Sequence, residues 1–378
     1  MPRQSPAPGG DRFPCRQCGA LQVFKPGSTA LECTYCGHRT PIEVHDGLII
    51  EYDFDEALET LADAPPAGAR PSTQCENCAA EFDFDEHVHA GECPFCGTQI
   101  VAGTGTHRHI KPESLLPFSV DESAALGAYR RWIKRLWFAP NAIKNYARQT
   151  ERLTGVYVPY WTYDSQTHTR YRGQRGDNYT VRESYTAIEN GRSVRRTRTV
   201  TKIRWRSVSG QVARFFDDVL VGASRSLPRK ITDRLQPWDL DHLVGYDEKF
   251  LSGFRSEVYQ VDLDEGFDQA VNIMDRVIRS DIARDIGGDH QRIQQVQTRH
   301  SDTTFKHLLL PVWSAGFRFR KKTYRFVVNG RTGKVAGERP YSVVKIALAV
   351  VLGGIAAAAA FYVAIETGLL DELLRNVA

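Results

Sequence analysis

The sequence predicts a multidomain chain. Two small hairpin units, each held by a metal ion, precede a mixed α+β domain with an antiparallel sheet, and one transmembrane helix follows at the C-terminus. Three observations support this prediction. Eight cysteines form an internal repeat near the start, strand-like and amphipathic segments share the middle, and an uncharged apolar run lies near the end. The 378 residues allow two or three packed units, because domains usually run about 100–150 residues.

All the cysteines belong to C-x2-C pairs, and the pattern C-x2-C-x14-C-x2-C occurs twice with an offset of 60 residues. The two sets are Cys15, Cys18, Cys33 and Cys36, and Cys75, Cys78, Cys93 and Cys96. A tetrahedral zinc site needs four thiolates at about 2.3 Å, and each C-x2-C turn supplies two of them. Glycine follows three of the four pairs and suits the positive φ of such a turn, whereas Ala79 follows the third pair.

The run CPFCG at 93–97 matches the pattern C-P-x-C-G in full and resembles the knuckle of zinc ribbons and rubredoxin-like proteins. Between the knuckles, apolar and polar residues alternate around a turn, which predicts a short hairpin. The resemblance implies a zinc ribbon at 11–45 and a second ribbon at 73–103. We expect a disordered lead-in at 1–10 and an acidic segment with a linker at 46–72.

Four thiolates leave no open coordination position, so the two expected Zn2+ ions are structural and supply folding energy that such small units lack. Iron is the weaker alternative for the metal. Disulfides are the other alternative, and they are disfavoured because the orientation predicted below places the thiols in a reducing compartment. His87 and His89 lie in the second hairpin, and we interpret them as surface residues.

The net charge of +4 is unevenly distributed along the chain. Residues 1–104 carry ten more acidic than basic residues, whereas residues 105–345 carry sixteen more basic than acidic ones. Acidic residues concentrate in EYDFDE at 51–56 and EFDFDE at 81–86. Because nucleic acid is bound by neutralising its phosphates with Lys and Arg, the acidic ribbons favour a protein partner or the basic remainder of the chain.

The basic α+β domain at 104–341 contains two predicted amphipathic helices. The first covers 119–138, with Ser119 and Asp121 as capping residues and Pro140 just beyond its end. Its apolar stripe is Leu126, Tyr129, Ile133, Leu136 and Trp137, and its other arc holds Arg130, Arg131, Lys134 and Arg135. A packed helix is one interpretation, and a helix lying on an anionic inner leaflet is the other.

The second helix covers 262–288, begins with acidic residues and ends at Gly287-Gly288. Its apolar stripe is Phe267, Ala270, Met274, Val277, Ile278 and Ile282. Residues at this spacing lie on one face of a helix, so we interpret the stripe as part of the core.

The segments 155–173 and 308–335 are rich in aromatic and β-branched residues and predict strands, the latter with a hairpin at NGRTG, residues 329–333. Between them, 192–206 holds seven basic residues and no acid. Read with a period of two, one face of this strand carries Arg196, Arg198, Lys202, Arg204 and Arg206. A solvated sheet face is one interpretation; lipid head groups, the acidic ribbons or RNA are the alternative contacts.

The sequence predicts a protein that is not an enzyme. Gly333-Lys334 lacks the upstream glycine of a phosphate-binding loop, and GASRS at 222–226 does not match the nucleophile elbow G-x-S-x-G. Asp289 and His290 form an isolated Asp-His pair, which is weak evidence for acid–base chemistry. A fold can also carry a site scattered along the chain.

Residues 346–365 carry no charge, and at about 1.5 Å per residue they match the roughly 30 Å hydrocarbon core of a bilayer. A buried Ala-rich helix is the alternative, and it is disfavoured because Lys345 and Glu366 bracket the run. Basic residues precede the run, which predicts a single-pass inner-membrane protein with a cytoplasmic N-terminus. The transmembrane segment is then 342–366, and 367–378 is a short non-cytoplasmic tail.

Small residues on this run permit helix pairing and hence an oligomer. They are Gly353 with Ala357, and Gly354 with Ala358.

Taken end to end, the chain contains, in this order, two ribbons, LPF, GVYVPYWTYD, FFDDVLVGAS, PWDL, DIGGDHQRI, TFKHLLLPVW, GERPYS and the final helix. This order resembles that of a bacterial family of membrane-anchored TFIIB-type zinc-ribbon proteins. Members often carry the label primosomal protein N′ or superfamily II helicase, and the resemblance implies no assigned biochemical role. The helicase label conflicts with this sequence, because a helicase motor needs a nucleotide-phosphate loop. The run NGRTGKVAGERP at 329–340 is also similar to the closing hairpin of a PepSY-type module.

These observations favour a non-catalytic adaptor or scaffold in the bacterial inner membrane, with its ribbons docking a protein partner near the anionic leaflet. The alternative is a nucleic-acid-binding or helicase-associated accessory protein that uses the basic middle domain.

Overall fold

The computed structural model of the chain describes residues 13–20, 22–44, 49–63, 72–74, 80–83, 90–92, 99–101, 110–141, 153–189, 192–319, 322–339 and 341–367. Some of the predictions concern residues outside these stretches. They are the lead-in at 1–10, most of the linker, the four cysteines Cys75, Cys78, Cys93 and Cys96, the histidines His87 and His89, and the tail beyond residue 367.

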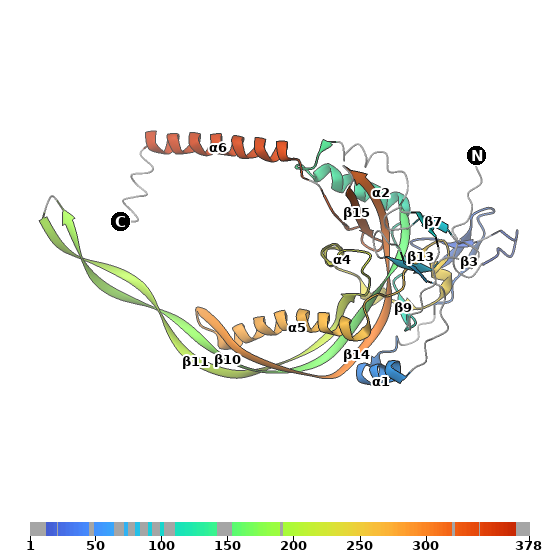
Figure 1. Cartoon of the computed structure of the whole chain (residues 1–378), viewed down its shortest axis with the longest axis horizontal. Helices are drawn as coiled ribbons and strands as arrows, with labels where there is room; N and C mark the ends of the chain where they lie inside the picture. Colours follow the sequence, from blue (N-terminus) through green and yellow to red (C-terminus); the bar gives the residue numbers. More distant parts are fainter. Residues whose placement is uncertain are drawn as a thin grey trace.

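A long, curved, mainly antiparallel sheet organises the chain (Figure 1). Its main strands run in the order β11 (Arg192–Gly222), β10 (Thr154–Glu189), β14 (His290–Phe319), β15 (Lys322–Asn329) and β16 (Val335–Gly337). The short strands attached to it are β4 (Tyr52–Asp53), β9 (Ser114–Leu115), β12 (Val244–Gly245) and β13 (Arg255–Ser256). The α+β fold with an antiparallel sheet is therefore confirmed, as is the hairpin at 329–333, which joins β15 to β16.

The described helices are α1 (Phe54–Asp63), α2 (Glu122–Arg135), α4 (Arg229–Leu235), α5 (Leu263–Ile286), α6 (Val343–Glu366) and the 3-10 turns η1 (Leu240–His242) and η2 (Glu248–Leu251). Figure 1 shows α5 lying along the concave side of the sheet, and α6 leaving the body beside α2. The body therefore has one layer of sheet with helices packed on it, and α6 projects from it.

Helix α5 packs its apolar stripe on β10, β11 and β14, as the sequence predicts. Its buried residues are Leu263, Gly266, Ala270, Met274, Ile278, Ile282 and Ile286. The helix ends where predicted, with Gly287 at its C-cap and a φ of 64°. Val277 is 36% exposed, so its assignment to the core is wrong; the buried row repeats every fourth residue through Met274 and Ile278, and Val277 lies beside it.

Helix α2 begins where the sequence predicts, because the Asp121 side chain accepts a hydrogen bond from the N–H of Ala124 at 2.7 Å. Tyr129 and Ile133 are buried against the sheet, which confirms a packed helix. Trp137 is 78% exposed, so its assignment to the apolar stripe is wrong. The helix stops at Arg135, and the backbone beyond it no longer follows the helical period.

Strands β10 and β11 extend well beyond their neighbour β14. Pairing with β14 ends at Gly176 and His290, whereas β10 and β11 stay paired as far as Glu189 and Arg192. We call the two-stranded part, residues 177–189 and 192–204, the distal arm. Thr, Val, Tyr and Ile recur along it and favour extended backbone. Figure 1 shows this arm projecting far from the body.

Replacing Gly266 with alanine should lower the free energy of unfolding by about 1–3 kcal/mol, because overpacking a close helix–sheet contact forces side chains to move. A Cβ on Gly266 would meet the Tyr163 hydroxyl and lie 2.9 Å from Cδ1 of Trp161. Urea denaturation of the purified chain measures this.

Gly127→Ala in α2 is the matched control, because a Cβ there meets only the flexible end of Arg131 at 3.4 Å. It should raise stability by up to about 1 kcal/mol through helix propensity. Equal effects of the two substitutions would contradict the close packing of α5 on β10.

Candidate functional site

The first ribbon is a three-stranded antiparallel sheet of β1 (Gln22–Phe24), β2 (Ala30–Cys33) and β3 (Arg39–Pro41). Its two cysteine turns share one backbone design. The N–H of Gly19 donates to the carbonyl oxygen of Cys15 at 2.9 Å, and the N–H of Gly37 donates to that of Cys33 at 3.0 Å. Both glycines have a φ of 73°, as predicted from their place after the second cysteine.

These turns bring the four thiols of the first set together. Sγ of Cys18 lies 3.5 Å from Sγ of Cys33 and 3.5 Å from Sγ of Cys36, and Sγ of Cys15 lies 3.6 Å from that of Cys36. A disulfide needs about 2.05 Å. Four sulfurs around zinc at about 2.3 Å are about 3.8 Å apart, so the cluster fits a tetrahedral metal site and not a pair of disulfides.

The four thiols also differ in how readily they ionise. The backbone N–H of Cys36, followed by that of Tyr35, lowers the pKa of Cys33 to about 6. The backbone N–H of Ala20 lowers the pKa of Cys18, but burial and the neighbouring thiols outweigh it and raise this pKa to about 12. The cluster therefore holds protons that a bound cation has to displace, and metal binding should release them.

The first ribbon shares a core with the body. Phe24, Leu31 and Ile42 belong to the same buried cluster as Phe118 and Phe250. The N–H of Phe24 donates to the carbonyl oxygen of Ser252 at 2.9 Å, and the Ser252 hydroxyl donates to that of Gln22 at 2.8 Å. The cysteine cluster therefore stabilises a layer on which the rest of the body packs.

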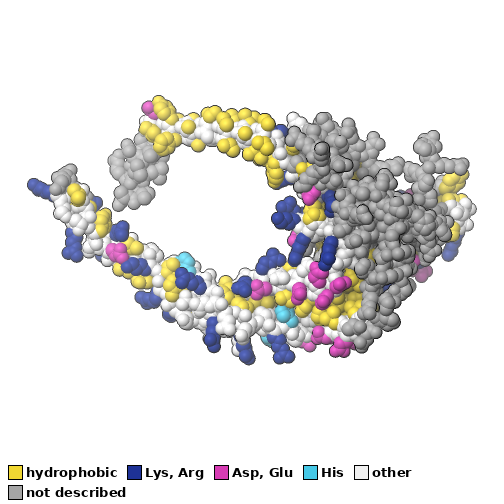
Figure 2. All heavy atoms as spheres, viewed as in Figure 1, with side chains coloured by type: hydrophobic (Ala, Val, Ile, Leu, Met, Phe, Trp, Pro, Cys, Tyr) yellow, Lys and Arg dark blue, Asp and Glu magenta, His cyan; other side chains and the backbone are white. Residues whose placement is uncertain are grey.

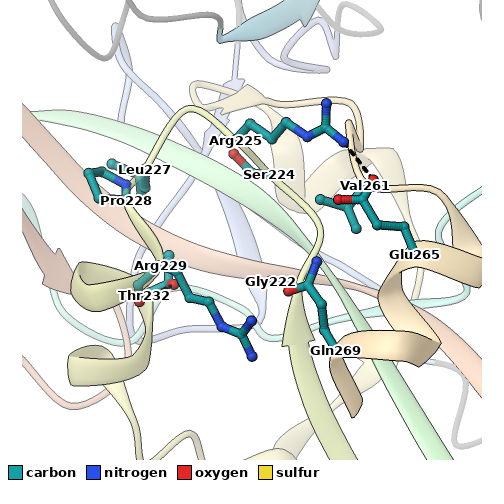
Figure 3. Close-up of a pocket in the computed structure, with 10 residues that line it drawn as sticks. All are labelled: Gly222, Ser224, Arg225, Leu227, Pro228, Arg229, Thr232, Val261, Glu265 and Gln269. Carbon is teal, nitrogen blue, oxygen red and sulfur yellow. Dashed lines mark hydrogen bonds and ion pairs between the residues drawn. The ribbon is translucent and has the colours of Figure 1, made fainter. Parts of the chain in front are cut away.

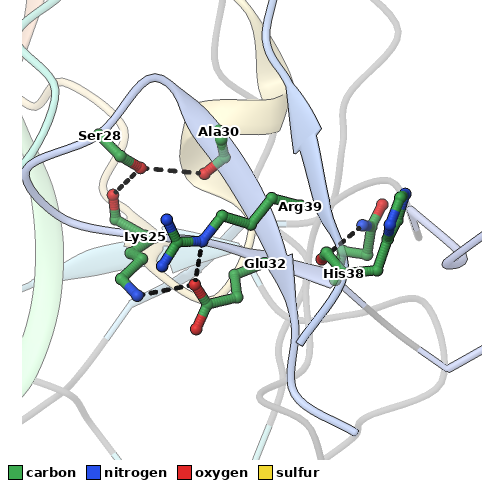
Figure 4. A network of polar contacts seen from close by, with 7 residues as sticks. Lys25, Ser28, Ala30, Glu32, His38 and Arg39 are labelled. Atoms are coloured by element: carbon green, nitrogen blue, oxygen red, sulfur yellow. Dashed lines mark hydrogen bonds and ion pairs between the residues drawn. The ribbon is translucent and has the colours of Figure 1, made fainter. Parts of the chain in front are cut away.

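On the outer side of the ribbon, Glu32 accepts hydrogen bonds from Nζ of Lys25 at 2.7 Å and Nε of Arg39 at 2.8 Å (Figure 4). Lys25 and then Arg39 lower the pKa of this carboxyl. The described stretch 13–44 has three basic and two acidic residues, so the first ribbon is not itself acidic. The acidic charge begins after it, in the segment that contains α1.

The second set of cysteines lies outside the described residues, but the strands around it are described. They are β5 (Ser72–Gln74) with β6 (Glu81–Asp83), and β7 (Ala90–Glu92) with β8 (Gln99–Val101). The β7–β8 pairs, such as Glu92 with Gln99, lie 60 residues beyond the β2–β3 pairs, such as Glu32 with Arg39. The repeat is therefore preserved in strand register as well as in cysteine spacing.

The predicted basic face lies on β11, mainly in the distal arm, and all five of its residues are exposed. Acidic residues of β10 partly neutralise it. Glu183 pairs with Lys202 at 2.6 Å and with Arg198 at 3.8 Å, and Asp177 pairs with Arg206 at 2.6 Å. The Arg204 guanidinium lies 4.9 Å from the centre of the Tyr179 ring. Arg196 is also exposed. The face is therefore cationic, but three of its cations are paired with acids of β10.

Asp289 and His290 lie at the start of β14 and contact the arm. Asp289 accepts a hydrogen bond from the N–H of Asn178 at 2.7 Å, and Nε2 of His290 lies 3.1 Å from Oδ1 of Asn178. Both contacts attach the start of β14 to β10, at the point where pairing with β14 ends and the arm begins. This geometry gives the pair a structural role at the base of the arm.

A buried charge cluster was missed by sequence reasoning. Asp164 of β10 is 4% exposed and accepts a hydrogen bond from the N–H of Asp218 at 2.6 Å. Lys306 of β14 pairs with Asp218 at 2.8 Å and with Glu51 at 2.9 Å. The sequence does contain a local indication of this cluster, the run FFDD at 215–218, where two acids interrupt a strand pattern. In the structure, Asp218 has a φ of 50°.

Oxygens of Asp164, Asp217 and Asp218 lie close enough to share a cation. The ammonium of Lys306 already supplies a positive charge to Asp218. Burial, followed by its hydrogen bond with Glu51, raises the pKa of Asp164 to about 7. Burial also opposes ionisation of Glu51, but Lys306 outweighs this and lowers the Glu51 pKa. The cluster thus ties the segment after the first ribbon to the sheet through Lys306 and the Asp164 carboxyl.

A polar pocket of about 460 Å³ lies between α4 and the start of α5 (Figure 3). Arg225 pairs with Glu265 at 2.5 Å on one side of it. Behind it, the buried Glu257 accepts hydrogen bonds from the hydroxyls of Ser224 and Ser226, each at 2.8 Å. Both serine hydroxyls therefore hold the loop 222–228 in place.

One relative is a chain from Bacillus subtilis (strain 168) that is called uncharacterized protein YdjG. It is 26% identical over 340 residues, which cover 89% of this chain and 92% of the relative. No family model matches the chain, and no solved structure matches it. The similarity extends over most of both chains, and it assigns no activity.

Cys33→Ser should lower the bound zinc by about one ion per chain, because four thiolates hold one ion. Tyr35→Ser is the matched control, since this neighbouring side chain is 84% exposed and is not a thiol. Elemental analysis of the purified chains measures the zinc content. An unchanged metal content in Cys33→Ser would refute the metal site.

Asp164→Asn should flatten the dependence of stability on pH between about 4 and 7. The folded chain holds the Asp164 proton up to about pH 7, while the unfolded carboxyl loses it near its ordinary pKa of 3.8. The free energy of unfolding of the wild type therefore falls as the pH rises through this window.

An asparagine keeps the acceptor for the Asp218 N–H and can donate to Glu51. Denaturation at pH 5 and pH 8 measures the difference, with the exposed Asp268→Asn as control. A variant that loses stability with pH as steeply as the wild type would show that Asp164 is not the titrating group.

Proposed function

We propose that the protein is a non-catalytic, membrane-anchored adaptor of the bacterial inner membrane. In this proposal α6 spans the bilayer and places the rest of the described chain in the cytoplasm. Two zinc ions, one per ribbon, hold the ribbons structurally, and acidic groups around them dock a protein partner near the anionic leaflet. The observation that carries the proposal is the apolar helix α6, which the described body leaves uncovered (Figure 2). It belongs to a chain with an excess of acidic residues at 1–104 and of basic residues at 105–345.

The first support comes from α6 itself. This helix has 24 residues, a mean hydropathy of 2.4, and no buried residue in its apolar window. An apolar helix that is exposed on all sides is unfavourable in water, whereas a bilayer covers it. A Cβ at Gly353 or Gly354 would meet nothing within 4 Å, so this side is open to a second α6 and to the oligomer proposed from the sequence.

The second support is the outer face of α1, which follows the first ribbon. Phe54 buries one side of the helix against Tyr163 and Phe267, with ring centroids 6.2 and 4.6 Å apart. The opposite side presents the exposed carboxylates Asp55, Glu56 and Glu59. A helix fixed by its apolar side with acids outward suits a partner that carries a basic patch.

The zinc ions serve the fold in this proposal and not chemistry. The four thiols of the described cluster fill the coordination of a tetrahedral ion, which leaves no position for a substrate. The ion would hold the two turns together and so keep Phe24 and Leu31 against the body. The preserved register of β7 and β8 supports a second site of the same kind.

The alternative is a nucleic-acid-binding or helicase-associated accessory protein that uses the distal arm. A two-stranded ribbon fits the major groove of DNA, and the arm presents arginines with Tyr179 and Tyr185 beside them. Against this, Asp177 and Glu183 already engage three cations of the face. The adaptor is therefore the better supported function.

Replacing the three exposed acids of α1, as Asp55→Asn, Glu56→Gln and Glu59→Gln, should reduce capture of the partner by at least about tenfold, or 1.4 kcal/mol. Capture is measured by mass spectrometry after purifying the full chain from gently solubilised membranes. The control carries Asp241→Asn and Asp268→Asn, which remove exposed acids elsewhere on the body.

Unchanged capture by the α1 variant would refute the acidic docking surface. Nuclease treatment of the wild-type sample separates the two candidate functions. Proteins that are lost after nuclease are held through nucleic acid, and this result would favour the arm-based alternative.

A further inference from the structure

The start of α6 is hydrogen-bonded to the segment after α2, residues 136–141. The N–H of Ser342 donates to the carbonyl oxygen of Phe138 at 2.8 Å. Nζ of Lys345 donates to the carbonyl oxygens of Trp137 at 3.2 Å and Ala139 at 2.8 Å, and to Oδ1 of Asn141 at 2.8 Å. An ammonium has three donors, so these contacts use all of them. Lys345 therefore fastens the segment after α2 to the start of the apolar helix.

Three large aromatic side chains stand in the open around this junction. Trp137 is 78%, Tyr341 56% and Phe138 42% exposed. Exposed tryptophan and phenylalanine are unfavourable in water, but tryptophan and tyrosine are enriched where a transmembrane helix enters the polar layer of a bilayer. The Arg339 guanidinium lies over the Tyr341 ring at 5.3 Å, which places a cation beside the ring.

The position of Lys345 fixes the depth of these side chains. The uncharged run of α6 begins directly after it, so its ammonium marks the edge of the hydrocarbon. The polar layer of a bilayer is about 5–7 Å thick on each side. The ammonium contacts the backbone of Trp137 and Ala139. The segment after α2 therefore lies within that layer when α6 spans the bilayer.

The outer arc of α2 has the charge that this location requires. Arg130, Arg131, Lys134 and Arg135 are exposed, while Tyr129 and Ile133 on the opposite arc are buried. Cations beside an aromatic anchor favour anionic head groups.

We infer that the segment after α2, residues 136–141, is an interfacial anchor, with Trp137 and Phe138 inserted among the head groups of the anionic leaflet beside the start of α6. The inference rests on the proposed function, because it takes α6 as the membrane span. It adds a second attachment, which sets the orientation of the body on the membrane surface. Lys345 is the positioning residue that joins the two attachments.

The test uses the full chain in vesicles that contain one quarter anionic lipid. The difference in fluorescence between the wild type and Trp137→Phe gives the emission of Trp137. This emission should be quenched by lipids brominated near the head group, and less by lipids brominated deep in the acyl chain. Trp205→Phe gives the matched control on the sheet, and its emission should be untouched by either lipid.

Lys345→Met removes the three donors and should abolish most of the shallow quenching of Trp137, whereas Lys345→Arg should keep it. Quenching of Trp137 by aqueous iodide, with no effect of brominated lipid, would overturn the inference. Resistance of the chain to alkaline carbonate extraction reports α6 separately. A chain that resists extraction but keeps Trp137 in water refutes only the interfacial anchor, whereas an extracted chain refutes the membrane span.

Discussion

The described body depends on strand β10, which pairs with both β11 and β14 between Tyr160 and Gly176. Near Asp164 the pairing shifts on both sides, because each neighbour contributes one extra residue. On β11, Asp217 and Asp218 lie opposite Asp164, and on β14, Asp302 and Thr303 lie opposite Ser165. Asp218 and Asp302 both have a φ of 50°. These paired bulges free the N–H of Asp218 to bind the Asp164 carboxyl and separate the body part of the sheet from the part that becomes the arm.

The first ribbon and helix α2 are connected through one packed core. Phe24 and Leu31 of the ribbon, Phe118 and Phe254 of the body, and Tyr129 of α2 all belong to the same buried cluster. The Phe118 and Phe254 rings stack with centroids 4.3 Å apart, and the Tyr129 ring stacks on Phe326 at 3.5 Å. Loss of the ribbon fold therefore removes surface on which α2 depends, and α2 holds the first turn of α6.

The features that the sequence predicts correctly are those set by local spacing. The turns of the first cysteine set, the start of α2, the stripe of α5 and the apolar run each depend on residues a few positions apart. The cluster around Asp164 depends instead on register between residues about 50 to 140 positions apart, as in the pairing of Asp164 with Thr304. The arm is a hairpin, but its length depends on where β14 stops pairing with β10, at Gly176 and His290. The exposure of Trp137 was missed for a related reason: helical periodicity assumes that the helix continues, and it stops two residues earlier.

Charge and backbone together decide which part of the protein can meet the bilayer. Figure 1 shows the arm and α6 projecting to the same side of the body. Both outer edges of the described arm lack a neighbouring strand, so hydrocarbon would leave its backbone groups without partners, and its arginines add to that cost. If α6 spans the bilayer as proposed, the arm has to remain in water or among head groups, and α6 has to enter the bilayer at an angle that clears the arm. In the structure, Lys345 binds the carbonyl oxygens of Trp137 and Ala139, so the direction in which α6 leaves the body is coupled to the segment after α2. In the proposed orientation, this junction keeps the body at the membrane surface beside the start of α6.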